Sequence, residues 1–320
     1  MDVSVIVCTY NRSNLLERTL KSVAAQQVPG DIEWEVIVVD NASTDATPEV
    51  ARRFADECPN IRCVREEQQG LSHARNRGID EAVGALVCFI DDDVRLPTDY
   101  VSRAHAAWKG GSWGVAGGRA VADYEIPCPA WVRRLPPKML NAPFGVHDRG
   151  ERDFIIDDSD EIVPIGANML IPHTVFEKIG TFDTELGRTG KSLRSGEDSE
   201  FYERARRAGL SIAYCGSCAL RHFVPRERLK RRFFVRWKLR ASLTGGREVL
   251  PADTVYWLRV PRFQWRSLAE AFLRLVISVV AGRRTQRLIE FSGELGRVIG
   301  HLTGSRLTAP ADSHGNAARD

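Results

Sequence analysis

The chain has 320 residues, and its 45 lysines and arginines against 42 aspartates and glutamates leave a formal net charge of +3. So small a net charge does not indicate a general nucleic-acid-binding protein, and 43% hydrophobic residues are enough for a substantial core. The sequence begins with an apolar run instead of the basic segment of a signal peptide, which favours a cytoplasmic setting. The longest uncharged apolar stretch of the C-terminal third, residues 275–282, is shorter than the ~20 residues that a membrane-spanning helix needs.

The first hundred residues alternate between strand patterns and helix patterns. Short β-branched runs predict buried strands, and segments with apolar residues three and four positions apart predict helices. We expect strands over residues 3–10, 35–43, 61–67 and 85–93, and helices over residues 13–27, 44–58 and 70–84. This alternation predicts an α/β fold with a mostly parallel, twisted sheet flanked by helices.

The rest of the chain is less regular and suggests a division into three parts. We expect helices over residues 98–108 and 196–209, strands over 113–121 and 210–223, a strand followed by a helix within 163–183, and a loop over 127–150. We place a catalytic domain at residues 1–245, a basic amphipathic helical extension at 246–308 and a disordered tail at 309–320.

Polar residues follow three of the predicted strands at the point where each strand ends. Thr9, Tyr10 and Asn11 follow the first, Asp40 follows the second, and the triplet Asp91–Asp93 follows the fourth. The carboxyl ends of parallel strands meet at one edge of a sheet, and ligands bind there in α/β proteins. We therefore expect these side chains to lie together at a binding site.

The aspartate triplet Asp91–Asp93 needs compensation, because like charges at the end of a buried strand repel one another and are poorly solvated. One interpretation is a site for Mg²⁺ or Mn²⁺, which take carboxylate oxygens together with substrate phosphates. The other is a solvated acidic turn in which Asp93 caps the next segment of the chain. The triplet alone leaves both interpretations open.

Asp40 and Arg75 are further candidates, each with an ordinary structural alternative. The Asp40 carboxylate could accept hydrogen bonds from a nucleobase, or it could cap the helix that starts near Thr44. Arg75 and Arg77 could bind a diphosphate, because arginine suits phosphate geometry, or they could be ordinary charges on a surface helix. For Arg77 the structural interpretation is the stronger one.

Three residues of the second half are also candidates for chemistry. Glu197 and Asp198 begin a predicted helix, where the helix dipole favours carboxylates, but a carboxylate beside a nucleotide site could also be a general base. His222 follows the strand segment that ends in CALR. A histidine beyond a strand end can be a metal ligand, although most lone histidines are structural.

Seven segments occur together along the chain: VSVIVCTYNR, VIVVDNASTD, GLSHARNRGI, VCFIDDDV, IGANMLI, IGTFD and SGEDSEFYERARRAG. Each segment alone is a weak signal, but in this order and spacing they resemble the family 2 glycosyltransferases with the GT-A fold. The resemblance covers roughly residues 3–245. It implies a bacterial or archaeal enzyme of polysaccharide or glycolipid synthesis that transfers a sugar, with inversion, from a nucleotide-diphosphate donor.

The resemblance also implies how the donor is bound. By similarity, Thr9, Tyr10 and Arg12 line the nucleotide pocket. Asp40 would hold the base, and Arg75 would contact the donor phosphate or the base. UDP is the nucleotide that the resemblance favours, while GDP and dTDP stay open.

A divalent metal ion, Mn²⁺ or Mg²⁺, is part of the same expectation. By similarity, Asp91 is the first member of a D-x-D pattern, Asp92 holds the ribose and Asp93 binds the metal. His222 matches a position that completes the metal coordination in some relatives. A bound cation would neutralise the charge on the departing diphosphate.

The acceptor side of the site rests on three residues. By similarity, Asn168 lies near the donor sugar and the acceptor, and Asp198 is the catalytic base with support from Glu197. The acceptor would be a saccharide or a lipid-linked saccharide. The alternative is a GT-A-like domain that binds nucleotide sugars or glycans without turnover, against which the intact acidic motifs argue.

The C-terminal part raises a separate question. Residues 221–247 are rich in arginine and lysine with aromatic residues between them, and two amphipathic helix patterns come after them, from about residue 267 and through residues 288–298. One hypothesis is contact with the inner face of the cytoplasmic membrane, because basic clusters and apolar helix faces bind anionic lipid surfaces. The other is packing on the catalytic domain or in a homodimer. Both stay open.

Overall fold

The computed structural model describes the chain outside residues 158–159, 161–163, 188–195, 246–253, 279–283 and 304–320. The predicted tail at 309–320 lies outside the described residues. The chain divides into two compact units, one of residues 1–127 and 136–225 and one of residues 128–135 and 226–320. Units defined by contacts need not be functional domains, so the domain boundaries expected from the sequence stay predictions.

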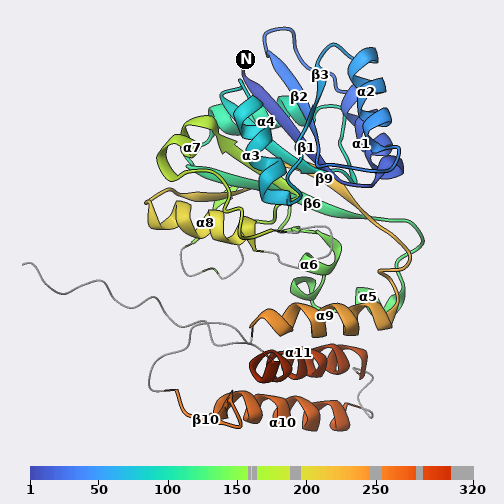
Figure 1. The fold of residues 1–320 in the computed structure, drawn as a ribbon, viewed down its shortest axis with the longest axis vertical. Coiled ribbons are helices and arrows are strands. Elements are labelled where there is room, and N and C mark those ends of the chain that lie inside the picture. Colours follow the sequence, from blue (N-terminus) through green and yellow to red (C-terminus); the bar gives the residue numbers. More distant parts are fainter. Residues whose placement is uncertain (158–159, 161–163, 188–195, 246–253, 279–283, 304–320) are drawn as a thin grey trace, which may run out of the picture. The chain divides into compact units, whose positions relative to one another are not determined.

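A nine-stranded mixed sheet forms the centre of the first unit (Figure 1). Its main path runs β3-β2-β1-β4-β8-β6-β9-β5, and β7 pairs with β9. The strands are β1 (Val3–Thr9), β2 (Trp34–Asp40), β3 (Ile61–Arg65), β4 (Leu86–Asp91), β5 (Val94–Arg95), β6 (Val115–Tyr124), β7 (Phe154–Ile155), β8 (Asn168–Pro172) and β9 (Ile212–Val224). Strands β1 to β4, β6 and β9 run in one direction, whereas β5, β7 and β8 run against them. The sheet is therefore mostly parallel, as the sequence predicted.

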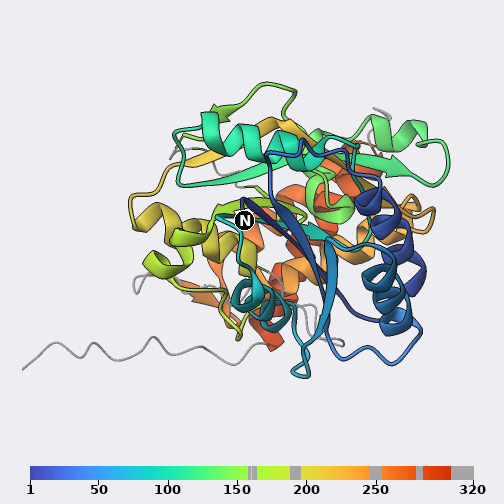
Figure 2. The ribbon, with the colours of Figure 1, turned by 90° about the horizontal axis from the view of Figure 1, so that it is seen from above.

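Helices cover both faces of this sheet (Figure 2). Helices α1 (Ser13–Ala24), α2 (Thr47–Glu57) and α4 (Tyr100–Gly110) contribute to one apolar core. Helices α3 (Leu71–Glu81), α7 (His173–Ile179) and α8 (Glu197–Arg207) contribute to the other. Because successive strand residues point to opposite faces, Val5 and Val7 belong to the first core while Ile6 belongs to the second.

Residues 127–150 are not a plain loop, so the sequence-based expectation for them is wrong. They contain three short helices, α5 (Ala130–Arg133), the 3₁₀ helix η1 (Pro137–Met139) and α6 (Asn141–Phe144). Prolines begin or precede the first two, where their fixed φ suits the first helical turn. Such one-turn helices carry too little periodicity to be recognised from the pattern.

The second unit is mainly helical. It contains α5, α9 (Arg231–Gly245), α10 (Arg262–Ile277) and α11 (Arg284–Thr303), together with a hairpin of β10 (Tyr256–Trp257) and β11 (Val260–Pro261). Both predicted amphipathic patterns form helices, α10 and α11, and α11 packs against α9 and α10. None of the described helices is both long and apolar enough to cross a membrane.

Three glycines of α11 lie against α9. A Cβ added at Gly296 would lie 2.3 Å from the carbonyl oxygen of Leu239, and one at Gly300 would lie 2.2 Å from that of Leu243. At Gly293 the closest atom would be a carbon of Lys238, at 2.7 Å. At Gly296 and Gly300 the two helices therefore approach so closely that a side chain larger than hydrogen does not fit, whereas the flexible Lys238 side chain faces Gly293.

We expect Gly296→Ala to destabilise the protein by about 2 kcal/mol, because the new methyl group overpacks the contact between α9 and α11. A loss of stability would be informative, because replacing glycine by alanine normally stabilises a helix by up to about 1 kcal/mol. Urea unfolding of the full chain, followed by circular dichroism, measures the effect. Gly110→Ala on α4, where a Cβ would meet nothing within 4 Å, is the matched control and should not destabilise. A Gly296→Ala protein as stable as the control would contradict this helix packing.

Candidate active site

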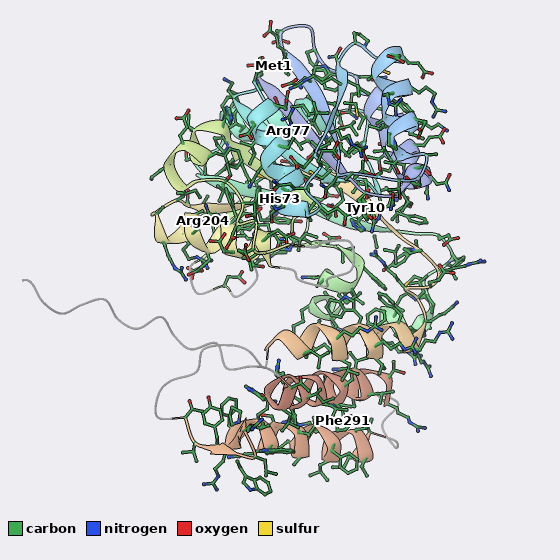
Figure 3. All side chains as sticks on the ribbon, viewed as in Figure 1. Met1, Tyr10, His73, Arg77, Arg204 and Phe291 are labelled. Carbon is green, nitrogen blue, oxygen red and sulfur yellow. The ribbon has the colours of Figure 1, made fainter. Side chains whose placement is uncertain are left out.

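The polar ends of three strands meet at one edge of the sheet. The parallel register sets Thr9 of β1 opposite Asp40 of β2 and brings the end of β1 beside Asp91 of β4. Tyr10 continues from this edge, and Figure 3 shows it away from Met1, which precedes β1. Side chains from three separate parts of the sequence therefore share the edge that the strand pattern predicted.

Two groups hold the carboxylate of Asp92. Arg12 donates from Nη1 to Asp92 Oδ1 at 2.9 Å and also to Asp93 Oδ2 at 3.1 Å. The Thr9 hydroxyl donates to the other oxygen of Asp92 at 2.8 Å. The side chains of Asp92 and Asp93 are only 6% and 5% exposed, so these charges interact where water screens them little.

The backbone of the triplet is held from two sides. The Thr19 hydroxyl of α1 lies 2.8 Å from the carbonyl oxygens of both Asp92 and Val94, and it accepts a hydrogen bond from the Val94 N–H at 3.1 Å. On the other side, the N–H of Phe223 in β9 donates to the Asp93 carbonyl oxygen at 2.8 Å. The turn that presents the carboxylates is thereby fixed between α1 and β9.

His222 faces the triplet from β9. Its Nε2 lies 3.1 Å from Asp93 Oδ1 and 3.4 Å from Asp91 Oδ2, and the ring is buried. The strand predicted over residues 210–223 includes His222, which β9 confirms, whereas its placement beyond a strand end is wrong, because β9 continues past it and pairs it with Val94 of β5. This short antiparallel pairing brings the imidazole against the carboxylates.

Gly145 lies against the imidazole of His222. A Cβ at position 145 would lie 2.6 Å from Nε2, and Gly145 has a φ of +63° at the C-terminal end of α6. The left-handed backbone and the close approach both require glycine. The segment that contains α6 therefore borders the candidate site.

The charges of the cluster compensate one another within the protein. Burial raises the pKa of Asp92 to about 6, although Arg12 opposes this shift. Burial also disfavours the ionised form of Asp91, but the hydrogen bond from His222 and the attraction of His222 and Arg75 together lower the pKa of Asp91. For His222, burial lowers the pKa, but attraction to Asp93 and hydrogen bonds to both carboxylates raise it to about 9. Arg12, whose pKa is raised chiefly by Asp92, and a protonated His222 thus offset two of the three negative charges of the triplet.

Asp91, Asp93 and His222 form a group that could hold a metal ion. One ligand atom from each residue lies within 4.8 Å of the others, and no other such group occurs among the residues with described positions. Two carboxylate oxygens and an imidazole nitrogen suit Mn²⁺, and the carboxylates also suit Mg²⁺. The donor set therefore fits a divalent cation.

Asp40 is buried at the end of β2 and is held by two groups. Nη1 of Arg65 donates to its Oδ2 at 3.0 Å, and the backbone N–H of Ser43 donates to its Oδ1 at 3.2 Å. The bond to Ser43 holds the turn that follows β2. No sequence pattern indicated Arg65, whose position follows from the β2–β3 register that sets it beside Asp40.

A second cluster joins α3 to α8. Arg75 is 3% exposed and donates from Nη1 to Oε1 of Glu197, itself 5% exposed, at 3.0 Å. The guanidinium also lies over the ring of Phe182, 5.0 Å from its centre. Burial lowers the pKa of Arg75, but the attraction of Glu197, Asp198 and Asp91 outweighs it. Arg75 therefore links the two clusters electrostatically and is already paired within the protein.

Asp198 is half-buried beside this ion pair. Its Oδ2 accepts a hydrogen bond from the backbone N–H of Gly166 at 2.8 Å, and its Oδ1 accepts one from Ser199 at 2.8 Å. A Cβ at Gly166 would lie 2.4 Å from Nη2 of Arg75. Gly166 therefore allows Asp198 and Arg75 to approach one another, a role that the sequence pattern did not reveal.

The same face of α3 also holds the segment that leads toward α8. The Ser72 hydroxyl donates to the Leu186 carbonyl oxygen at 2.9 Å. The Asn76 side chain donates to the Phe182 carbonyl oxygen at 2.8 Å and accepts from the Phe182 N–H at 2.9 Å. Because Ser72, Arg75 and Asn76 recur at helical spacing, one face of α3 makes all three contacts.

Asn168 connects three elements next to the triplet. Its Oδ1 accepts a hydrogen bond from the Tyr100 hydroxyl of α4 at 2.8 Å, and its Nδ2 donates to the carbonyl oxygens of Arg119 and Cys218 at 3.1 Å and 3.0 Å. The register between β6 and β9 shifts at this point, just before Arg119. Such an irregularity leaves backbone groups unpaired in the ladder, and Asn168 satisfies two of them. Its predicted contact with substrate stays a prediction.

The predicted site residues thus form two neighbouring clusters and two separate contacts. The first cluster consists of Thr9, Arg12, Asp91, Asp92, Asp93 and His222, and the second of Arg75, Glu197 and Asp198. Asp40 pairs with Arg65, and Asn168 lies within the sheet. Their roles in binding and catalysis stay predictions.

A family model described as Glycosyl transferase family 2 matches residues 4–180, more than half of the chain. The matched part contains the parallel strands β1 to β4 and β6 and the triplet Asp91–Asp93, and it ends before α8 and β9. The chain therefore belongs to glycosyl transferase family 2, as the seven sequence segments predicted.

Two curated relatives illustrate the similarity. The glycosyltransferase AglE of Haloferax volcanii is 29% identical over 66% of this chain and 64% of its own length. The succinoglycan biosynthesis protein ExoM of Rhizobium meliloti is 27% identical over 81% of this chain and 78% of its own length. The chain thus spans a little less than two thirds of AglE and more of ExoM.

A solved structure supports the fold. The mannosyltransferase PcManGT of Pyrobaculum calidifontis, in complex with GDP-Man and Mn²⁺, resembles this protein with a TM-score of 0.60 at 20% identity. The likeness covers 94% of this chain and 87% of that one. Together with the family match, it confirms the α/β GT-A fold expected from the sequence.

We expect Mn²⁺ to bind at the group formed by Asp91, Asp93 and His222. Calorimetric titration, without nucleotide and in the presence of UDP or GDP, should show that Asp93→Asn and His222→Gln each weaken binding at least about tenfold, because each removes a ligand. Asp99→Asn, which alters an exposed carboxylate paired with Arg103 on α4, is the control and should leave the affinity unchanged. Wild-type affinity in both site variants would exclude this group as the metal site.

We expect Arg75→Met to destabilise the protein by about 3 kcal/mol, because it leaves Glu197 buried without its cation. The double variant Arg75→Met with Glu197→Met should recover much of this loss, since an apolar pair avoids the unpaired buried charge. Thermal and urea unfolding measure both changes. A double variant no more stable than Arg75→Met alone would show that the buried ion pair is not the cause.

Proposed function

We propose that the protein is an inverting glycosyltransferase that moves a sugar from a nucleotide-diphosphate sugar to a hydroxyl of a saccharide or lipid-linked acceptor. The observation that carries the proposal is the group of Asp91, Asp93 and His222, which fits a divalent cation, at the strand-end edge of a family 2 chain. ExoM is named for succinoglycan biosynthesis, and PcManGT was solved with a nucleotide sugar and Mn²⁺. Both relatives support this class of reaction.

In this proposal the strand ends bind the nucleotide. Thr9, Tyr10 and Arg12 line its pocket, and Asp92 holds the ribose. Asp40 holds the base, with Arg65 keeping its carboxylate oriented at 3.0 Å. The charged arrangement supports this assignment, because Arg12 is already fixed between Asp92 and Asp93 and is therefore in place to bind a diphosphate.

Asp93, with Asp91 and His222, would hold the divalent metal ion. When bound, the ion would neutralise charge that develops on the departing diphosphate. His222 would hold the ion as a neutral imidazole, so that metal binding would be coupled to loss of the proton on this ring. Mn²⁺ is our preferred ion because the set includes a nitrogen donor.

Asp198 is the proposed catalytic base. Its two oxygens accept hydrogen bonds from backbone N–H groups, which fix the carboxylate without neutralising it. It would take the proton from the acceptor hydroxyl as that hydroxyl attacks the anomeric carbon from the face opposite the diphosphate. A single displacement of this kind inverts the configuration, and a positioned base of this kind contributes about 10²–10⁴ to the rate.

Arg75 and Glu197 support this base. Their ion pair fixes the first turn of α8, in which Asp198 lies, against α3. We retain the proposal that Arg75 also contacts the donor, because one buried guanidinium has more donors than the bond to Glu197 uses. Asn168, next to the triplet in the sheet, would place the donor sugar and acceptor.

The donor nucleotide has three candidates, UDP, GDP and dTDP, and the acceptor has one class. The resemblance seen in the sequence favours UDP, whereas the solved relative PcManGT was crystallised with GDP-Man. The acceptor proposed is a saccharide, free or linked to a lipid. We further propose that the reaction takes place in the cytoplasm.

The test is a hydrolysis and transfer panel of UDP-, GDP- and dTDP-sugars with Mn²⁺ or Mg²⁺, using the full chain. We expect one donor class to be consumed, EDTA to abolish turnover, and Asp198→Asn to lower the transfer rate at least about 100-fold, because the base is lost. Donor affinity should be retained.

Glu203→Gln alters another carboxylate of α8, one that pairs with arginines of its own helix, and should keep full activity. Wild-type transfer by Asp198→Asn would remove Asp198 as the base. Tight donor binding without turnover under any metal would instead support the alternative, a GT-A-like domain that binds nucleotide sugars without catalysis.

A further inference from the structure

The helical unit carries an exposed apolar surface on α10 and the hairpin of β10 and β11. Six of its large side chains are between 52% and 63% exposed: Trp257, Leu258, Phe272, Leu273, Val276 and Ile277. We call these six residues the α10 surface. Single exposed apolar residues are ordinary, but six that are near one another in a helix and its adjoining hairpin mark an interaction site.

The opposite face of α10 already has its packing partner. Gln264, Ala271 and Ser278 are buried at a spacing of seven residues, and Gln264 donates to Glu294 of α11 at 2.6 Å. A helix with one such face normally has a polar face toward water. In α10 the outward positions instead include Leu273 and Ile277, four residues apart. Phe272 meets Phe291 of α11 with ring centres 5.8 Å apart, but packing against α11 does not account for the exposed Leu273 and Ile277.

The hairpin is joined to α10, so that both belong to one surface. The Trp265 indole N–H of α10 donates to the Trp257 carbonyl oxygen at 3.0 Å, and the two rings meet edge to face with centres 5.7 Å apart. At the tip, Leu258 and Arg259 both have positive φ, +51° and +65°. Asparagine and glycine are preferred in such a turn. A leucine and an arginine there are costly for folding, which favours a function for the exposed tip.

The charge of the chain is strongly divided between the two units. Residues 128–135 and 226–320 contain 21 lysines and arginines and 8 aspartates and glutamates, a difference of +13. The other unit has 24 against 34, a difference of −10, and the two sum to the +3 of the whole chain. On α10 itself, Arg266 and Arg274 are 82% and 58% exposed beside the apolar positions. An apolar face with basic neighbours on a basic unit complements an anionic surface.

We propose that the α10 surface binds a lipid bilayer that contains anionic lipids, with α10 lying in the plane of the interface and the hairpin tip inserted beside it. At 16 residues α10 is about 24 Å long, less than the ~30 Å of the hydrocarbon core, so it lies on the bilayer and does not cross it. A second copy of the chain is a poorer occupant, because it would bring together two units that each carry +13. This proposal is independent of the transfer reaction.

The test is flotation of the full chain with vesicles of phosphatidylcholine alone or with about one third phosphatidylglycerol. We expect binding to the anionic vesicles, at least about tenfold weaker binding to the neutral ones, and release by salt. Leu273→Glu with Ile277→Glu should weaken binding at least about tenfold, because charge enters the apolar face. Trp257→Ser with Leu258→Ser tests the hairpin in the same way and leaves α10 intact.

Val83→Glu is the matched control, because Val83 is 64% exposed but lies in the other unit, and it should bind like the wild type. Circular dichroism and donor hydrolysis confirm that each variant is folded. Absent binding to anionic vesicles, or unchanged binding by both double variants, would overturn the proposal. The proposal would also be overturned, in favour of a second copy of the chain, by two results together. These are absent vesicle binding and a dimer in light scattering that the double variant Leu273→Glu with Ile277→Glu dissociates.

Discussion

The first unit depends on the electrostatic balance at the end of β4. Three consecutive carboxylates, two of them nearly inaccessible to water, are tolerated because Arg12 approaches from the loop after β1 and His222 approaches from β9. The contacts of Thr19 and Phe223 with the backbone of the triplet hold the carboxylates beside these two cations. Two positive charges offset part of the three negative ones, and the remaining negative charge favours a bound divalent cation.

The second cluster shows the same principle with a different outcome. Glu197 and Asp198 are adjacent, yet Glu197 is buried against Arg75 while Asp198 is half-buried and held by backbone N–H groups. One carboxylate thus fixes the helix, and the other is held by the backbone N–H groups of Gly166 and Ser199. The two adjacent acidic residues therefore have different physical environments, as the proposed division into a base and its support requires.

The sequence predicted the longer strands, most helices, and the meeting of Thr9, Asp40 and the triplet, because these follow from local periodicity and from the topology of parallel sheets. It failed where a contact depends on pairing between distant segments. The place of His222 depends on β5, a strand of two residues, and the contact of Arg65 with Asp40 depends on the register of β2 with β3. The seven-segment resemblance supplied the family, which no single local pattern contained.

Gly145 has a consequence for how such a site can diversify. Its backbone and the closeness of its Cα to His222 leave no room for a side chain. Nearby surface positions of the same segment, including Asn141 and Ala142 on α6, do not have the positive φ of Gly145. A segment with one position restricted to glycine and neighbours without that restriction can change by substitution while its contact with His222 stays constant. Sequence variation and the constancy of the charged cluster would then be separated within a few residues.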